Sequence, residues 1–265
     1  MKAPGVYALL VLGALAAAQP AAAESPWRLG VAMGYGERTN PLVFSEDIPI
    51  VVDIDVAWFG KRFFFDNGDL GYTFADNSLF TGSLVARFNS DRVFFGKTET
   101  RFVNFGFDGA ALTTLELIEV PDRDYAVEAG FELLADGSWG YLQFAAHHDV
   151  SGKHDGYELD VNYGIGWRSE RWYIEPSVGV SFKSAELNTY YWGVRLEESN
   201  TALPVYETGS GINLRGRLAL SYYVSRHWAL SFAGEYERLN SDAASSPIVR
   251  ERQTLGYFAG IRYRF

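Results

Sequence analysis

The stretch GYELDVNYGIGW, residues 156–167, alternates apolar with polar or small side chains along its whole length. The apolar set is Tyr157, Leu159, Val161, Tyr163, Ile165 and Trp167, and the other set is Glu158, Asp160, Asn162, Gly164 and Gly166. Because successive side chains of a β-strand point to opposite faces, this period of two predicts a strand with one apolar and one charged face. Its length exceeds the about 5 to 6 residues usual in soluble sheets and fits the roughly 9 to 11 residues of a tilted membrane-spanning strand.

The same alternation recurs along the chain. It is found at residues 27–35, 50–58, 79–88, 125–134, 140–149, 172–182, 213–224, 228–237 and 254–265. The polar faces carry charges at mid-strand, which a soluble sandwich could not place toward its core without a large desolvation cost. A barrel with lipid outside and a polar lumen removes this conflict. We therefore predict an all-β fold, a closed antiparallel up-and-down transmembrane β-barrel.

The connections between these strands alternate in length. Short ones lie at 59–62, 75–77, 135–138, 168–171 and 225–227, and mostly longer ones lie at 36–48, 90–123, 148–156, 183–211 and 240–252. This asymmetry is typical of short periplasmic turns and extended external loops. We interpret RFFFDNGDLGYTF, residues 62–74, as a hairpin that turns at 66–69, which gives 12 strands. The count is ten if that hairpin does not span the membrane.

Composition narrows the class of protein further. The chain has 265 residues, 48% of them hydrophobic, and no cysteine, so its stability cannot come from disulfides. Its formal net charge of −10 would repel nucleic acid, and we exclude that class of partner. Residues 1–23 resemble a cleaved signal peptide, with Lys2, an apolar run, and Ala21 and Ala23 in the small-x-small pattern. After them no apolar run approaches the roughly 20 residues of a membrane helix, so we predict one barrel domain over 24–265.

Aromatic residues mark one end of the predicted barrel. Six tryptophans lie at the start of the first strand or beside short turns, and they are Trp27, Trp58, Trp139, Trp167, Trp172 and Trp228. Tryptophan favours the membrane interface because its ring is apolar while its N–H needs a polar partner, so we predict a periplasmic aromatic girdle. Tyr263 and the terminal Phe265 resemble the signal by which outer-membrane barrels are recognised for insertion.

The predicted lumen is rich in charge. The side chains predicted to line it are Asp53, Asp55, Glu128, Glu132, Glu158, Asp160, Glu175, Glu235, Arg215, Arg217, Arg262 and Arg264, and Arg28 faces the same way. In one interpretation these groups pair and fill a narrow interior with salt bridges. In the other, the excess of acid favours small cations in a water-filled pore.

The stretch HHDVSGKHDG, residues 147–156, groups histidines with acids and a serine. The candidate members of a site here are His147, Asp149, Ser151, His154 and Asp155. These residue types could bind zinc, nickel or copper, or act as nucleophile, base and acid of a lipid hydrolase. The third interpretation, which we favour, is a tight external hairpin in which Asp149 and Ser151 bond to local backbone while Gly152 and Gly156 take unusual dihedrals. We therefore assign no catalytic, cofactor-binding or metal-binding residue and expect no cofactor.

The external loops hold two further candidates. Tyr190, Tyr191 and Trp192 could fold inward over the mouth of the barrel, form an outer binding patch, or belong to a self-packed loop that stabilises the outer rim. We favour a loop that folds over the mouth. Basic residues of these loops could contact lipopolysaccharide phosphates, although such scattered charges are more often only solvated, and they are Lys97, Arg101, Lys153, Arg250 and Arg252.

Several motifs together resemble the family of the MltA-interacting protein and OmpV. In order, they are WRLGVAMGYG (27–36), KRFFFDNGDLGYTF (61–74), HDVSGKHDGYE (148–158), IEPSVGVSFKSAELNTYYWGV (174–194), EES (197–199), YETGSG (206–211), RLNSDAASSPIV (238–249) and YRF (263–265). Their order and spacing over nearly the whole chain carry the resemblance. It implies an outer-membrane barrel of a Gram-negative bacterium, in contact with lipid and lipopolysaccharide, and it implies no catalysis.

The resemblance also sets the functional hypotheses. It implies a non-enzymatic scaffold that holds a murein-cleaving lytic transglycosylase near a penicillin-binding synthase. OmpV-like relatives suggest a small porin-like channel or a surface adhesin instead, and an outer-membrane lipid hydrolase is the weakest alternative. The short periplasmic turns argue against a large scaffold interface, because small contacts seldom bind tightly.

Overall fold

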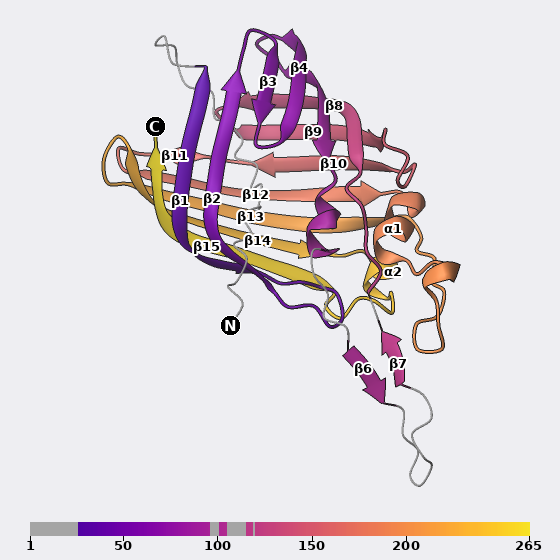
Figure 1. Cartoon of the computed structure of the whole chain (residues 1–265). Helices are drawn as coiled ribbons and strands as arrows, with labels where there is room; N and C mark the ends of the chain where they lie inside the picture. The colour runs from indigo at the N-terminus through magenta and orange to yellow at the C-terminus, as the bar shows by residue number, and fades with distance from the viewer. Residues whose placement is uncertain (1–25, 96–100, 105–114, 119) are drawn as a thin grey trace.

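The computed structural model describes residues 26–95, 101–104, 115–118 and 120–265, in which 12 antiparallel strands close into a barrel (Figure 1). In ring order these are β1 (Trp27–Arg38), β2 (Ile48–Phe59), β3 (Phe63–Asp66), β4 (Asp69–Asp76), β5 (Thr81–Phe88), β8 (Val127–Gly137), β9 (Gly140–Asp149), β10 (Tyr157–Gly164), β12 (Trp172–Lys183), β13 (Gly211–Tyr223), β14 (Trp228–Arg238) and β15 (Gln253–Arg264). The ring is sealed where β15 pairs with β1, and the predicted fold is confirmed.

Two further strand pairings stand outside the ring. The short β11 (Trp167–Arg168) lies between β10 and β12 in the chain and pairs with β12. A separate two-stranded sheet consists of β6 (Arg101–Asn104) and β7 (Leu115–Ile118). No helix within the described ranges is long and apolar enough to cross a membrane. The predicted signal peptide at 1–23 lies outside the described residues.

The two faces of each long strand differ as the alternation predicts. In β10, Glu158 and Asp160 are each 2% exposed, whereas Val161 is 38% and Tyr163 41% exposed. Strands β12, β13 and β15 show the same contrast between a polar inner face and an apolar outer face. An outer surface of exposed aliphatic and aromatic side chains around a polar lumen is the arrangement required of a barrel in lipid.

The hairpin of β3 and β4 turns at Asn67 and Gly68, as predicted, and both residues have positive φ (52° and 112°). It is short, because β2 pairs with β3 only through the last three residues of β2, from Ala57 to Phe59. Asn67 ends this pairing: its backbone N–H donates to the Val56 carbonyl at 2.9 Å, and its side-chain oxygen accepts from the Val56 N–H at 2.9 Å. Beyond this point no strand among the described residues pairs with that edge of β2. The wall therefore has a notch above the hairpin.

The short connections gather at one end of the barrel, hereafter the turn end, and the long connections at the other, the loop end. Helices α1 (Ala185–Trp192) and α2 (Ser241–Ala244) and the 3-10 helices η1 (Ser90–Phe95) and η2 (Leu196–Glu198) belong to the long connections, and α1 and α2 lie at the loop end in Figure 1. Each α-helix has a side-chain cap: the Ser184 hydroxyl accepts from the Leu187 N–H, and the Asn240 side chain accepts from the Ala243 N–H.

The long connections share an apolar core, hereafter the cap. Its buried members are Leu42, Phe94, Phe95, Val120, Leu187, Tyr191, Trp192, Val194, Leu203, Leu239, Ala243 and Ile248. They come from four different loops, and Tyr191 and Trp192 are fully buried. Tyr191 and Trp192 are therefore packed inside the cap and do not form an outer binding patch.

Replacement of Val178 by Arg tests whether the outer face meets hydrocarbon. Val178 lies at the middle of β12 and is 63% exposed, while Val150, just beyond β9 in an external connection, is 62% exposed. Arginine at the bilayer midplane of a barrel costs about 2–4 kcal/mol. We expect Val178→Arg to lower the unfolding free energy in lipid vesicles by that amount and Val150→Arg to leave it unchanged. Equal effects of the two substitutions would contradict a lipid-facing β12.

Candidate functional site

Arg87 on β5 is the centre of the charge network in the lumen. Its guanidinium contacts Glu128 at 3.0 Å and Glu158 at 2.6 Å, and it lies 3.7 Å from Asp160. These partners come from β8 and β10, so one side chain joins three strands around the inside of the barrel. Our list of lumen charges omits Arg87, although the alternation of Ser83, Val85 and Arg87 within β5 marks it as inward-facing.

A second buried cation connects the lumen to the cap. The Lys183 ammonium lies 2.7 Å from both carboxylate oxygens of Asp91, in η1, and 3.9 Å from Glu158. Both Lys183 and Asp91 are almost completely buried. Their ion pair holds η1 against the end of β12 and therefore ties the cap to the barrel wall.

The remaining predicted lumen charges lie on the inner face, and most have a described partner. Arg28 binds Asp55 at 3.1 Å and Asp66 at 2.8 Å, and Arg262 binds Asp53 at 2.6 Å. Four further contacts are Arg215 with Asp160, Glu132 with Gln143, Glu175 with Tyr173, and Glu235 with Arg38 at 3.9 Å. Arg217 lies opposite Glu235 in the β13–β14 register. Arg264 is two residues from Arg262 on the same face of β15. This pattern favours the interpretation in which the charges pair and fill the interior.

Four of the five residues of the predicted rim site gather around the Asp149 carboxylate, mainly through backbone groups. Asp149 accepts from the backbone N–H groups of Ser151, Lys153, His154 and Asp155 and from the Ser151 hydroxyl. It therefore organises the external hairpin, as we favoured. No group of three or more potential ligands within the described ranges could hold a metal ion.

His147 and His154, two of the three histidines of this stretch, each approach a different glutamate of β8. His147 faces the lumen, where its Nε2 is 3.6 Å from Glu132, and Nε2 of His154 is 3.5 Å from Glu128. Our assignment of unusual dihedrals is correct for Gly152 (φ 68°) and wrong for Gly156, since the second positive φ (53°) belongs to Asp155. Gly156 is needed for a different reason: a Cβ there would lie 2.5 Å from the Ser184 hydroxyl at the start of α1.

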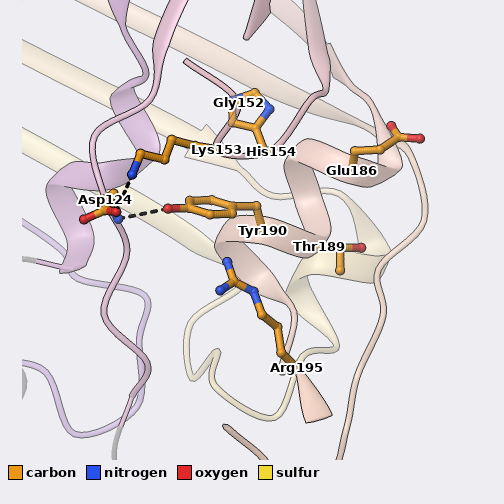
Figure 2. Close-up of a pocket in the computed structure, with 8 residues that line it drawn as sticks. All are labelled: Asp124, Gly152, Lys153, His154, Glu186, Thr189, Tyr190 and Arg195. Atoms are coloured by element: carbon orange, nitrogen blue, oxygen red, sulfur yellow. Dashed lines mark hydrogen bonds and ion pairs between the residues drawn. The ribbon is translucent and has the colours of Figure 1, made fainter. Parts of the chain in front are cut away.

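A shallow pocket of about 450 Å³ opens where this hairpin meets α1 (Figure 2). It is lined by Asp124, Gly152, Lys153, His154, Glu186, Thr189, Tyr190 and Arg195. Figure 2 shows Lys153 reaching Asp124, at 2.6 Å, and the Tyr190 hydroxyl accepting from the Asp124 N–H at 3.0 Å. The Arg195 guanidinium lies 4.9 Å from the Tyr190 ring centre. Both cations therefore already have partners, and the pocket contains charges of both signs.

Arg123 fastens the loop beneath this pocket. Its side chain is fully buried, binds Glu198 at 2.6 Å and donates to the Gly193 carbonyl at 3.0 Å. Burial raises the pKa of Glu198, but hydrogen bonds from Arg123 and from the Arg195 N–H outweigh that effect, and the net result is a lowered pKa.

The predicted tryptophan girdle lies at the turn end. Trp27 and Trp58 are cross-strand neighbours with ring centres 6.5 Å apart, and Trp139 stacks on Tyr163 at 6.3 Å. Five of the six tryptophans are exposed by about half, namely Trp27, Trp139, Trp167, Trp172 and Trp228. Tyr263 and Phe265 join the same belt, and Phe265 is 73% exposed.

A closed antiparallel barrel with an apolar outer face and a charged lumen defines a β-barrel membrane protein. The profile of the family described as MltA-interacting protein MipA matches residues 29–265, and the chain belongs to that family. It is therefore an outer-membrane β-barrel protein, as the motif resemblance implied.

The relatives differ in how much of the chain they match. The MltA-interacting protein of Escherichia coli K12 is 24% identical over 97% of this chain and 98% of its own length. Outer membrane protein OmpV of Vibrio cholerae is 30% identical over 44% of this chain, and the alignment spans about half of that relative, 46%. Outer membrane protein Omp26La of Vibrio anguillarum is 29% identical, again over 46% of its length. Among solved structures, a loop-deleted OmpT of Vibrio cholerae aligns over 90% of this chain and 99% of its own with a TM-score of 0.38 and 7% identity.

Removal of the Arg87 guanidinium should destabilise the barrel strongly. Arg87→Gln leaves Glu128 and Glu158 buried with fewer partners, and breaking a buried ion pair on one side costs about 3–5 kcal/mol. We expect urea unfolding of the detergent-solubilised protein to show such a loss, and Arg87→Gln combined with Glu158→Gln to recover part of it. The exposed Arg238→Gln serves as the matched control. A loss below 1 kcal/mol for Arg87→Gln would contradict its central role.

Acid should loosen the cap through Glu198. Because its pKa is lower in the folded protein than the ordinary 4.5, its stabilising contribution is complete above that pH and disappears as the pH falls through the folded value. We expect hydrogen exchange around η2 to accelerate below about pH 4 in the wild type and to lose that component in Glu198→Gln. The exposed neighbour variant Glu197→Gln should behave as wild type, and an unchanged pH profile in Glu198→Gln would count against this role.

Proposed function

We propose that the protein is a non-enzymatic scaffold of the outer membrane that holds a murein-cleaving lytic transglycosylase, and through it a penicillin-binding synthase, at the cell envelope. The observation that carries the proposal is membership of the MipA family along almost the whole chain, with a relative named MltA-interacting protein aligned over 97% of it. The alternatives of a channel, an adhesin and a lipid hydrolase have weaker support.

The internal architecture supports a scaffold over a wide channel. Arg87, Lys183 and Arg28 bind carboxylates across the lumen, and the cap covers the mouth with a continuous apolar core. A conducting pore requires a continuous water-filled path with weak binding along it. In planar bilayers we therefore expect no stepwise single-channel currents from the purified protein. Reproducible steps would move the assignment to a porin-like channel.

The hydrolase alternative is weakened by the bonding of the candidate triad. The Ser151 hydroxyl donates to Asp149, and Nδ1 of His154 accepts from the Gly156 N–H, while its Nε2 faces Glu128. A nucleophilic serine needs a hydrogen bond to its base, and no such bond between Ser151 and His154 occurs among the described contacts. This geometry favours a structural role for the stretch.

Surfaces for a periplasmic partner lie at the turn end, where the connections are short. We expect affinity capture from solubilised envelopes to enrich a lytic transglycosylase and a penicillin-binding protein with the tagged wild type. Charge reversal of three exposed turn acids, Asp76→Lys with Asp136→Lys and Glu170→Lys, should reduce this enrichment by about tenfold, because buried or partly buried charge mismatches at interfaces cost several kcal/mol.

The matched control reverses three exposed acids at the loop end, Glu46→Lys with Glu207→Lys and Glu251→Lys, and should capture as wild type. Failure of the wild type to enrich either enzyme would refute the scaffold. Equal losses in the two triple variants would refute docking at the turn end.

A further inference from the structure

We propose that the turn end carries two binding sites for the phosphate of anionic phospholipid headgroups in the adjacent membrane leaflet, built around Arg62 and Arg171. This inference concerns lipid and does not depend on the scaffold function. It rests on unpaired cations at the turn end, on their contacts with outward-facing tyrosines, and on the aromatic belt beside them.

The charge at the turn end contrasts with the chain as a whole. Three of the short turns hold five exposed cations, Lys61, Arg62, Arg168, Arg171 and Arg226, and one acid, Glu170. The complete chain has a formal net charge of −10. None of these five cations forms an ion pair with a described residue, whereas Arg87, Arg262 and Lys183 in the lumen are bound to carboxylates. The other two short turns add the exposed acids Asp76 and Asp136, so five exposed cations face three exposed acids and the turn end is net positive on an otherwise acidic protein.

Arg171 is fixed at the level of the lipid headgroups. Its guanidinium donates to the Tyr222 hydroxyl at 3.1 Å, and the Tyr222 ring lies 4.9 Å from the half-exposed Trp172. Tyr222 and Trp172 are direct cross-strand partners and so share the outer face. Tryptophan and tyrosine belts lie at the membrane–water interface, so this guanidinium lies beside the phosphates of the leaflet.

Arg62 repeats the arrangement on the other side of the ring. It donates to the Tyr72 hydroxyl at 3.2 Å, and the Tyr72 ring lies 4.9 Å from Phe63, which is 64% exposed and directly opposite. Lys61 precedes it in the same turn. A guanidinium with most of its donors free, held by one hydroxyl, has the fork geometry that binds phosphate oxygens in pairs.

Lipid fits these sites better than an acidic protein does. Both guanidiniums are bound to side chains of the outer, lipid-facing surface, where a protein in the periplasm would have to displace the leaflet. A basic segment at the membrane surface attracts anionic lipids, and the attraction is screened by salt. The ligand is thus a phospholipid with a net negative headgroup, such as phosphatidylglycerol.

The test uses the full-length protein in detergent, titrated with phosphatidylglycerol or phosphatidylcholine and followed by native mass spectrometry. We expect phosphatidylglycerol to bind at least fivefold more tightly than phosphatidylcholine at low salt. Arg62→Gln with Arg171→Gln should abolish the preference. Arg238→Gln with Arg252→Gln, which removes two cations at the loop end, should keep it. Unchanged thermal unfolding of both double variants shows that folding is intact.

Three outcomes overturn the proposal. The first is equal binding of the two lipids by the wild type, and the second is an equal loss of preference in both double variants. The third is complete displacement of phosphatidylglycerol by millimolar inorganic phosphate, which would identify a site for free phosphate. Loss of transglycosylase capture in Arg62→Gln with Arg171→Gln, with lipid preference unchanged, would assign the same cations to a protein partner instead.

Discussion

The binding of three carboxylates by Arg87 is the interaction on which the interior of this barrel depends. An up-and-down barrel has an inner face on every strand, and here those faces carry more acid than a low-dielectric interior can hold unpaired. The guanidinium joins β5 to Glu128 on β8 and to Glu158 and Asp160 on β10. Glu158 also lies near Lys183, whose partner Asp91 belongs to the cap. The wall, the lumen and the cap are therefore parts of one electrostatic network.

The two ends of the barrel differ in which side chains they bury and which they expose. The loop end is rigidified by an apolar core that four loops share, in the way that a small domain is stabilised, and its aromatic residues are buried. Within the part of the chain that the structure describes, the turn end has no such core, and its aromatic residues and free cations lie on the outside. The two ends therefore differ in their chemistry: buried apolar side chains gather at the loop end, and exposed aromatic and basic side chains gather at the turn end.

The barrel fold could be predicted from the sequence because the alternation of apolar and polar residues is a local signal. The strand predicted at 156–167, which the structure has at Tyr157–Gly164, follows from residues within a few positions of one another, as do the turn at 66–69 and the tryptophans of the turn end. The pairing of Lys183 with Asp91 joins residues 92 positions apart, and no local pattern specifies it. Alternation within β5 places Arg87 on the inner face, but its carboxylate partners lie on β8 and β10, and no local pattern specifies them. Alternation also explains why the neighbouring His147 and His148 differ, since His147 is buried and faces the lumen while His148 is exposed.

The notch beside β2 has a mechanical consequence. The chain ends meet through nine residue pairs between β1 and β15, whereas β2 and β3 share only three, and Asn67 terminates that short contact. Backbone N–H and C=O groups in hydrocarbon have no water to replace a broken hydrogen bond. The strand pair with the fewest backbone hydrogen bonds is therefore the one that separates at the lowest cost. On heating or under tension, we expect the barrel to open first between β2 and β3, while β1 and β15 remain paired.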